Sequence, residues 1–173
     1  ANASVFTIEG AYGDAEQIVA INRDIGDKKQ AEAALRRSEL TYREIFNSVN
    51  DCIWIHDVDT FEFVDVNQVV QTMFGYSREE AMSLSVGDIS SGIGPCTLAG
   101  AVSYMTRAAA GEPQVFEWHC RHKDGHLFWT EVSLKRGTIA DVERILAIER
   151  DITARKLAED ALRLTQFSVD HAS

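Results

Sequence analysis

Three cysteines carry the most reactive side chains in the sequence, because thiolates act as nucleophiles and as metal ligands. They are Cys52, Cys96 and Cys120, and they are far apart along the chain. Zinc and c-type haem motifs instead place their cysteines within a few residues of each other. The pattern therefore favours reduced thiols that are buried as small apolar side chains.

Other catalytic motifs are absent from the sequence. No Ser/His/Asp or Cys/His arrangement has supporting local sequence, and no pair of carboxylates stands out from the surface acids. The segment SGIGPC (91–96) contains glycines but lacks the Lys and Ser/Thr of a phosphate-binding P-loop. We therefore expect that this part of the chain is not an enzyme, and we assign no catalytic residue.

The composition limits the possible partners. The 173 residues carry a formal net charge of −10, and the 17 Lys and Arg residues are spread along the chain. Nucleic-acid binding requires a gathered basic surface, so nucleic acid and anionic membrane are not expected as partners. The sequence has no apolar run long enough to span a bilayer and no signal-peptide pattern at its start. We expect a cytoplasmic location.

Two segments of the chain are near-copies of each other. Residues 5–36 and 132–163 are identical at sixteen of 32 aligned positions, without a gap. A repeat separated by so many residues indicates tandem domains rather than a solenoid. We therefore predict that residues 1–26 form the C-terminal hairpin of a preceding domain.

Helical segments follow both copies. Residues 27–44 are predicted to form a linker helix, and small or apolar residues spaced by four and three from Ala31 to Val49 form a heptad seam. Two alternatives remain open here: one helix packed on its own domain, or a parallel pair of helices in a homodimer. A similar outgoing helix is predicted to start at Thr153, whose hydroxyl is placed to cap it.

The segment between the linker helices predicts strands at both ends and helices in the middle. The strongest local signal is Asp124-Gly125, which joins two long strands in a hairpin. The expected order is β-β-α-α-α-β-β-β, an α+β fold with a five-stranded antiparallel sheet. The predicted elements are strands within 51–67, helices at 68–75, 77–82 and 97–111, a loop at 83–96, and strands at 115–123, 126–136 and up to 152.

Three segments resemble the PAS domain with its C-terminal PAC segment: GYSREE (75–80), FEWHCRHKDGHLFWTEV (116–132) and ERDITARKLAEDAL (149–162). With VDVN at 64–67 the resemblance covers residues 45–152. It implies a PAS fold, with helices on one face of the sheet and linker helices on either side. The upstream copy, and a final FSVDHAS that resembles the start of a next domain within 153–173, imply a multi-PAS sensor. Such sensors are most often sensor histidine kinases of two-component systems.

Alternation along strands, combined with the resemblance to flavin-binding members, implies which side chains face the interior. The residues of this inward set that are predicted to line a possible ligand pocket are Trp54, His56, Phe116, Trp118, Cys120, Thr130 and Glu149. The other expected inward residues are Cys52, Val132, Leu134 and Ala147.

The side chains on the opposite face of the sheet, which include Val115 and Trp129, are also apolar. The linker helix or a partner subunit is therefore expected to cover that face.

The resemblance also bears on cofactors. Blue-light LOV domains, a PAS subclass, need a cysteine where Val86 stands, two asparagines where Cys120 and Thr130 stand, and a glutamine where Glu149 stands. LOV-type FMN is therefore not expected. Haem held by a histidine of the long helix is not expected either, since residues 97–111 contain none. The cofactor remains unknown, and the favoured expectation is that the domain holds no cofactor.

Other interpretations of the pocket stay open. His56, Cys120 and Glu149 could converge as metal ligands, or they could be packing and hydrogen-bonded groups, and no metal ligand is assigned. A small acid, or no ligand at all, fits as well. His119 and His122 are expected to be solvated, with His122 able to line the edge of the pocket.

The resemblance further implies a signal-coupling site at Asp151, Ile152 and Thr153, where the last strand becomes the outgoing helix. The leading hypothesis is a module that senses a ligand, or relays an upstream change, to this helix and to a kinase. A homodimer through the linker helices and the sheet face, beside neighbouring PAS and kinase domains, is the expected assembly. The alternatives are a structural spacer without a ligand and a flavin or metal redox sensor.

Overall fold

The computed structural model describes residues 3–9, 15–21 and 26–170. Two compact units are present, Ala1–Ile45 and Phe46–Ser173. In the first unit, β1 (Ala3–Glu9) and β2 (Ala15–Ile21) pair antiparallel, and helix α1 (Gly26–Ser48) begins. The two strands predicted near the start of the chain are therefore present, and their origin in a preceding domain stays a prediction.

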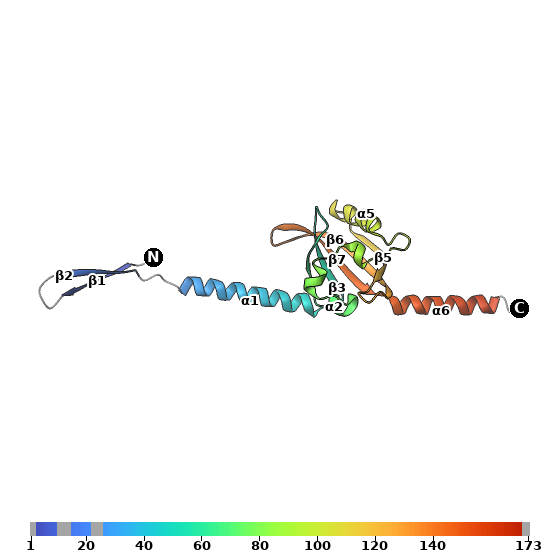
Figure 1. Cartoon of the computed structure of the whole chain (residues 1–173), viewed down its shortest axis with the longest axis horizontal. Helices are drawn as coiled ribbons and strands as arrows, with labels where there is room; N and C mark the ends of the chain where they lie inside the picture. Colours follow the sequence, from blue (N-terminus) through green and yellow to red (C-terminus); the bar gives the residue numbers. More distant parts are fainter. Residues whose placement is uncertain (1–2, 10–14, 22–25, 171–173) are drawn as a thin grey trace. The chain divides into compact units, whose positions relative to one another are not determined.

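The second unit is built on a five-stranded antiparallel sheet. Its strands are β3 (Cys52–Asp57), β4 (Phe63–Val66), β5 (Gln114–Arg121), β6 (Leu127–Ile139) and β7 (Val142–Asp151), in the order β4-β3-β7-β6-β5 (Figure 1). The predicted α+β class and antiparallel sheet are confirmed. The last strand in the chain, β7, occupies the centre of the sheet.

Short helices cover one face of this sheet. They are α2 (Val69–Phe74), α3 (Arg78–Ala81), α4 (Val86–Ile89) and α5 (Leu98–Ala109), and α6 (Thr153–Asp170) follows β7. Ser77 and Thr97 cap α3 and α5. The predicted loop at 83–96 is wrong in one part, because it contains α4. The Asp88 carboxylate accepts hydrogen bonds from the backbone N–H and the hydroxyl of Ser85, which stabilises this single turn.

The core lies between the sheet and these helices. Trp54 packs against Phe63 and Phe74, with ring centroids 4.5 and 5.3 Å apart, and Phe74 packs edge-on against Phe128. The predicted inward residues face this core on all four long strands, as the register requires. On the opposite face the cover is uneven, since Ile55 is 4% exposed and Val115 is 70% exposed.

A buried asparagine fixes the start of this unit. Asn67 is 1% exposed, and its side-chain oxygen accepts a hydrogen bond from the Ile53 backbone N–H at 3.0 Å. Its amide nitrogen donates to the backbone carbonyls of Phe46 and Asp51, at 3.2 and 3.0 Å. One side chain thus satisfies three backbone groups and joins the last turn of α1 to β3.

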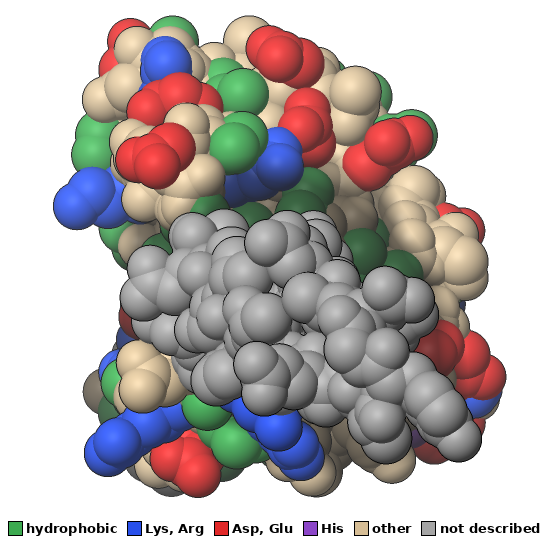
Figure 2. Space-filling view, turned by 90° about the vertical axis from the view of Figure 1, so that its left-hand side faces the viewer, with side chains coloured by type: hydrophobic (Ala, Val, Ile, Leu, Met, Phe, Trp, Pro, Cys, Tyr) green, Lys and Arg blue, Asp and Glu red, His purple; other side chains and the backbone are tan. Residues whose placement is uncertain are grey.

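No helix among the described residues is both long enough and apolar enough to cross a membrane. On the described surface drawn in Figure 2, acidic side chains occur in several places with basic side chains between them, in line with the net charge of −10.

We predict that Asn67→Ala lowers the free energy of unfolding by about 3 kcal/mol, because one buried and two part-buried backbone groups lose their partner. Urea denaturation measures this loss. Asn47→Ala is the matched control: the Asn47 side chain accepts one exposed hydrogen bond, from the Gln68 backbone N–H, and its loss should cost about 1 kcal/mol or less. Equal losses for the two variants would contradict this account.

Candidate functional site

A small cavity lies between the sheet and helices α4 and α5. Its volume is about 30 Å³, which is room for about one water molecule. Five of the seven predicted pocket residues line it, whereas Trp54 and Thr130 are buried beside it. The complete lining is His56, Phe63, Val86, Ile89, Ala101, Met105, Phe116, Trp118, Cys120, Val132, Leu134, Ala147 and Glu149.

Three polar side chains form a hydrogen-bonded cluster at this cavity. The Thr130 hydroxyl donates to Oε2 of Glu149 at 3.0 Å. Sγ of Cys120 lies 3.3 Å from the Thr130 hydroxyl oxygen and 3.7 Å from Oε2 of Glu149. The residues come from β5, β6 and β7, so the cluster links three adjacent strands across the sheet.

Burial changes the protonation of this cluster. It raises the pKa of Glu149 from its ordinary 4.5 to about 7, although hydrogen bonds from Thr130 and Cys120 and the nearby Trp54 indole favour the charged form. The Trp54 Nε1–H has no hydrogen-bond partner among the described residues. Burial also raises the pKa of the Cys120 thiol, so this thiol stays protonated near neutral pH.

His56 is neutral at the other end of the cavity. Burial lowers its pKa from 6.5 to about 4, and its Nδ1 lies 3.0 Å from the Phe61 carbonyl oxygen, which accepts a hydrogen bond from it. The three residues considered as metal ligands therefore all line the cavity. Within the described part of the chain, however, they do not form a group close enough to share an ion.

Two lining residues that sequence reasoning missed separate the cavity from the surface. Val86 and Met105 also line a groove of about 340 Å³ between the β3–β4 turn, α4 and α5. Val86 was missed because helix α4 was not predicted, and Met105 was missed because the predicted pocket residues were taken from the strands alone. The spacing of Ser85 and Asp88 is a capping signal that could have revealed that helix.

The predicted signal-coupling residues lie where β7 joins α6. The backbone N–H of Ile152 donates to the Trp129 carbonyl at 2.9 Å, and the Trp129 N–H donates to the Thr153 hydroxyl at 3.0 Å. The expected cap is wrong in its detail: the Asp151 carboxylate accepts from the Thr153 N–H at 2.7 Å and caps α6. The Thr153 hydroxyl instead ties the helix to β6.

Charged side chains strengthen this junction. Arg155 pairs with Glu117 on β5 at 2.9 Å, and the Lys156 ammonium also pairs with Glu117 and lies over the Trp129 ring. The first turn of α6 therefore rests on the outer face of β5 and β6, and it covers part of the apolar face that was expected to need cover.

The comparisons with known proteins identify the family. Residues 50–154 match the PAS domain family, and the chain belongs to this family. It is 36% identical over 135 residues to the methyl sulfide methyltransferase-associated sensor of Methanosarcina acetivorans, and 31% identical over 147 residues to sporulation kinase E of Bacillus subtilis. These matches cover 78% and 85% of this chain, but only 13% and 19% of the two relatives.

A solved structure agrees with this assignment. It is a domain of the sensory box sensor histidine kinase/response regulator from Geobacter sulfurreducens, 30% identical, with a TM-score of 0.55. The similarity covers 68% of this chain and 96% of that domain. The chain is thus a PAS sensory domain that resembles those of sensor kinases.

We predict that Glu149→Gln makes the free energy of unfolding less dependent on pH. Because folding raises the pKa of Glu149, the native protein loses stability as pH rises from 4.5 to about 7. The variant lacks this loss, so its free energy of unfolding relative to wild type should increase by up to about 3 kcal/mol across this window and then stay constant.

Urea denaturation at a series of pH values tests this. The contribution of His56 to the pH dependence of stability is the same in both proteins, so it cancels in their difference. Glu62→Gln, which changes an exposed carboxyl group after the β3–β4 turn, is the control and should show no such trend. A difference between Glu149→Gln and wild type that does not vary with pH would refute the assignment.

Proposed function

We propose that this PAS domain is a signal-relay module of a larger two-component sensor kinase, in which a change at the Glu149 cluster alters the position of α6. The observation that carries the proposal is the hydrogen bonding of Trp129 to both Ile152 and Thr153. Trp129 directly precedes Thr130, whose hydroxyl bonds to Glu149. The buried cluster and the outgoing helix are therefore joined through two adjacent residues of β6.

The size of the cavity favours a relay over a domain that holds a large cofactor. A volume of about 30 Å³ admits a water or a ligand of similar size without movement of side chains. A larger ligand would have to displace Val86 and Met105, which stand between the cavity and the surface groove. The polar lining, His56 and Glu149, would then favour a small polar ligand.

The linker helices support a homodimer as the working assembly. Apolar side chains of the predicted seam remain exposed on α1, and those of α6 do so as well: Leu35 63%, Ile45 65%, Leu157 66% and Leu164 69%. Pairing of these helices with a second copy would bury them.

The three cysteines are buried and unpaired, which suits the reducing cytoplasm we propose as the location.

We predict that Thr153→Ala in the intact parent changes kinase output, while Thr153→Ser, which keeps the hydroxyl, preserves it. In the isolated domain, loss of the acceptor for the Trp129 N–H should speed hydrogen exchange at that amide by about tenfold. Autophosphorylation with and without stimulus, and exchange measured by NMR, test the two parts.

Thr106→Ala is the matched control, since the Thr106 hydroxyl donates only within α5, to the Val102 carbonyl. Faster exchange at Trp129 with unchanged kinase output in both signalling states would reject the relay. That result would leave the domain a structural spacer.

A further inference from the structure

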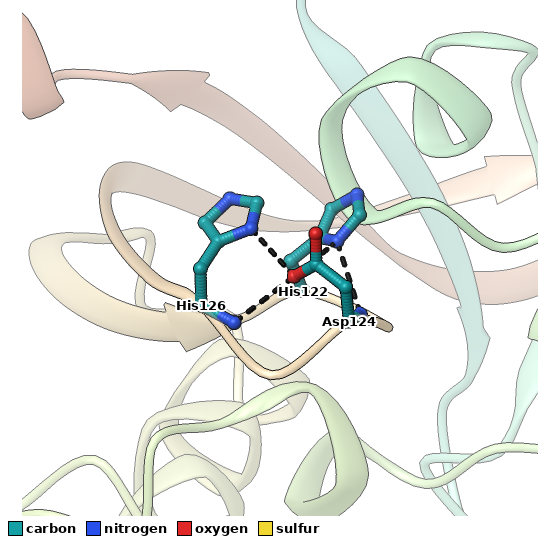
Figure 3. A group of neighbouring side chains, drawn as sticks. All are labelled: His122, Asp124 and His126. Atoms are coloured by element: carbon teal, nitrogen blue, oxygen red, sulfur yellow. Dashed lines mark hydrogen bonds and ion pairs between the residues drawn. The ribbon is translucent and has the colours of Figure 1, made fainter.

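A group of metal-binding side chains lies at the tip of the β5–β6 hairpin, away from the interior cavity. The ligand atoms of His122, Asp124 and His126 all lie within 4.8 Å of one another. Nδ1 of His122 and Nδ1 of His126 lie 3.0 and 2.6 Å from Oδ1 of Asp124. The two imidazole rings stack with their centroids 4.4 Å apart, and Figure 3 shows both rings beside the Asp124 carboxylate, to which dashed lines join them.

The hairpin holds these residues in place through its backbone. The His122 N–H donates to the His126 carbonyl, and the Gly125 N–H donates to the His122 carbonyl, each at 2.9 Å. Gly125 has a φ of +96°, which the tight turn requires and glycine adopts without strain. Three residues at alternate positions are thus brought together by a fixed turn.

Contact with α2 restricts the ring of His122. Gly75, which ends α2 in the left-handed conformation, leaves so little space that a Cβ there would lie 2.5 Å from Cε1 and Nε2 of His122. The side chain of His122 is therefore only 20% exposed, not solvated as expected, and the cavity lining does not include it. With Nε2 against Gly75, Nδ1 is the nitrogen directed at Asp124.

The neighbouring lysine does not compete for this position. The Lys123 ammonium pairs with both carboxylate oxygens of Glu80, at 2.6 and 2.7 Å, and the Lys123 backbone N–H donates to the Phe74 carbonyl. Its charge is thus held by α3, and its backbone anchors the hairpin to α2.

We propose that His122, Asp124 and His126 bind one divalent transition-metal ion of the Zn²⁺ or Ni²⁺ type. Two imidazoles and one carboxylate suit such ions, and metal–ligand distances of about 2.1 Å allow ligand atoms up to about 4.2 Å apart, which small ring rotations can achieve. The ion would replace the contacts of both rings with Asp124, and the hydrogen bond from the Asp124 N–H to His122 Nδ1. Three protein ligands leave positions for water or an external ligand.

Titration of the untagged domain with Ni²⁺ and with Zn²⁺, followed by calorimetry, tests this proposal. We expect saturable binding of one ion per chain, and a loss of affinity of tenfold or more in His126→Gln and in Asp124→Asn. NMR of the imidazole nitrogens should show the Nδ1 signals of His122 and His126 shifting with Zn²⁺, while those of His56 do not move.

Two control variants separate this site from adventitious binding. His119→Gln removes a histidine of the same hairpin outside the group, and Asp59→Asn changes an exposed carboxylate of the β3–β4 turn; both should bind the ion like wild type. His126 is exposed, so its replacement should leave the thermal unfolding temperature without metal unchanged. Absence of saturable binding at millimolar metal, or binding that survives both His126→Gln and His122→Gln, would overturn the proposal.

Discussion

The burial of Glu149 is the constraint on which the interior of this PAS domain depends. A carboxyl group at the centre of a sheet loses its hydration, and its hydrogen-bond partners Thr130 and Cys120 are neutral groups rather than cations. The protein responds by taking up a proton near neutral pH and by directing a hydroxyl at the carboxyl oxygen. Small shifts in the surroundings can therefore change the charge at this position, which makes it a suitable origin for a signal.

Strand β6 connects this buried group to the outer face of the sheet, because adjacent side chains of a strand point to opposite faces. Thr130 points into the core and bonds to Glu149, while its neighbour Trp129 holds Thr153 and Ile152 through backbone hydrogen bonds. Movement of β6 at Thr130 must therefore also displace the acceptor and donor groups of Trp129. Arg155 and Lys156 also pair with Glu117, which holds the first turn of α6 against the outer face of the sheet.

Much of this arrangement could be predicted from the sequence, because it follows from period-two alternation and one strong turn. The inward side chains of four strands and the Asp124-Gly125 hairpin are where the sequence places them. The size of the cavity could not be predicted, since it depends on how side chains of α4 and α5 fill the space above the sheet. The role of Asn67 was also hidden, because its three backbone partners are far from it in sequence. His122, Asp124 and His126 are recognisable as alternate residues around a predicted turn, but the orientation of the His122 ring also depends on its contact with Gly75, which is far from it in sequence.

The central claim is that a change at Glu149 reaches α6. It is tested most directly by following the backbone amides of Trp129, Ile152 and Lys156 by NMR between pH 5 and pH 8, in wild type and in Glu149→Gln. The account predicts that these amides titrate with a midpoint near 7 in wild type, and that this transition is absent from the variant. His119, which stacks on Trp129, can add its own transition, but that one would persist in both proteins. Amides of α6 that do not titrate in wild type, or that titrate identically in both proteins, would contradict the account.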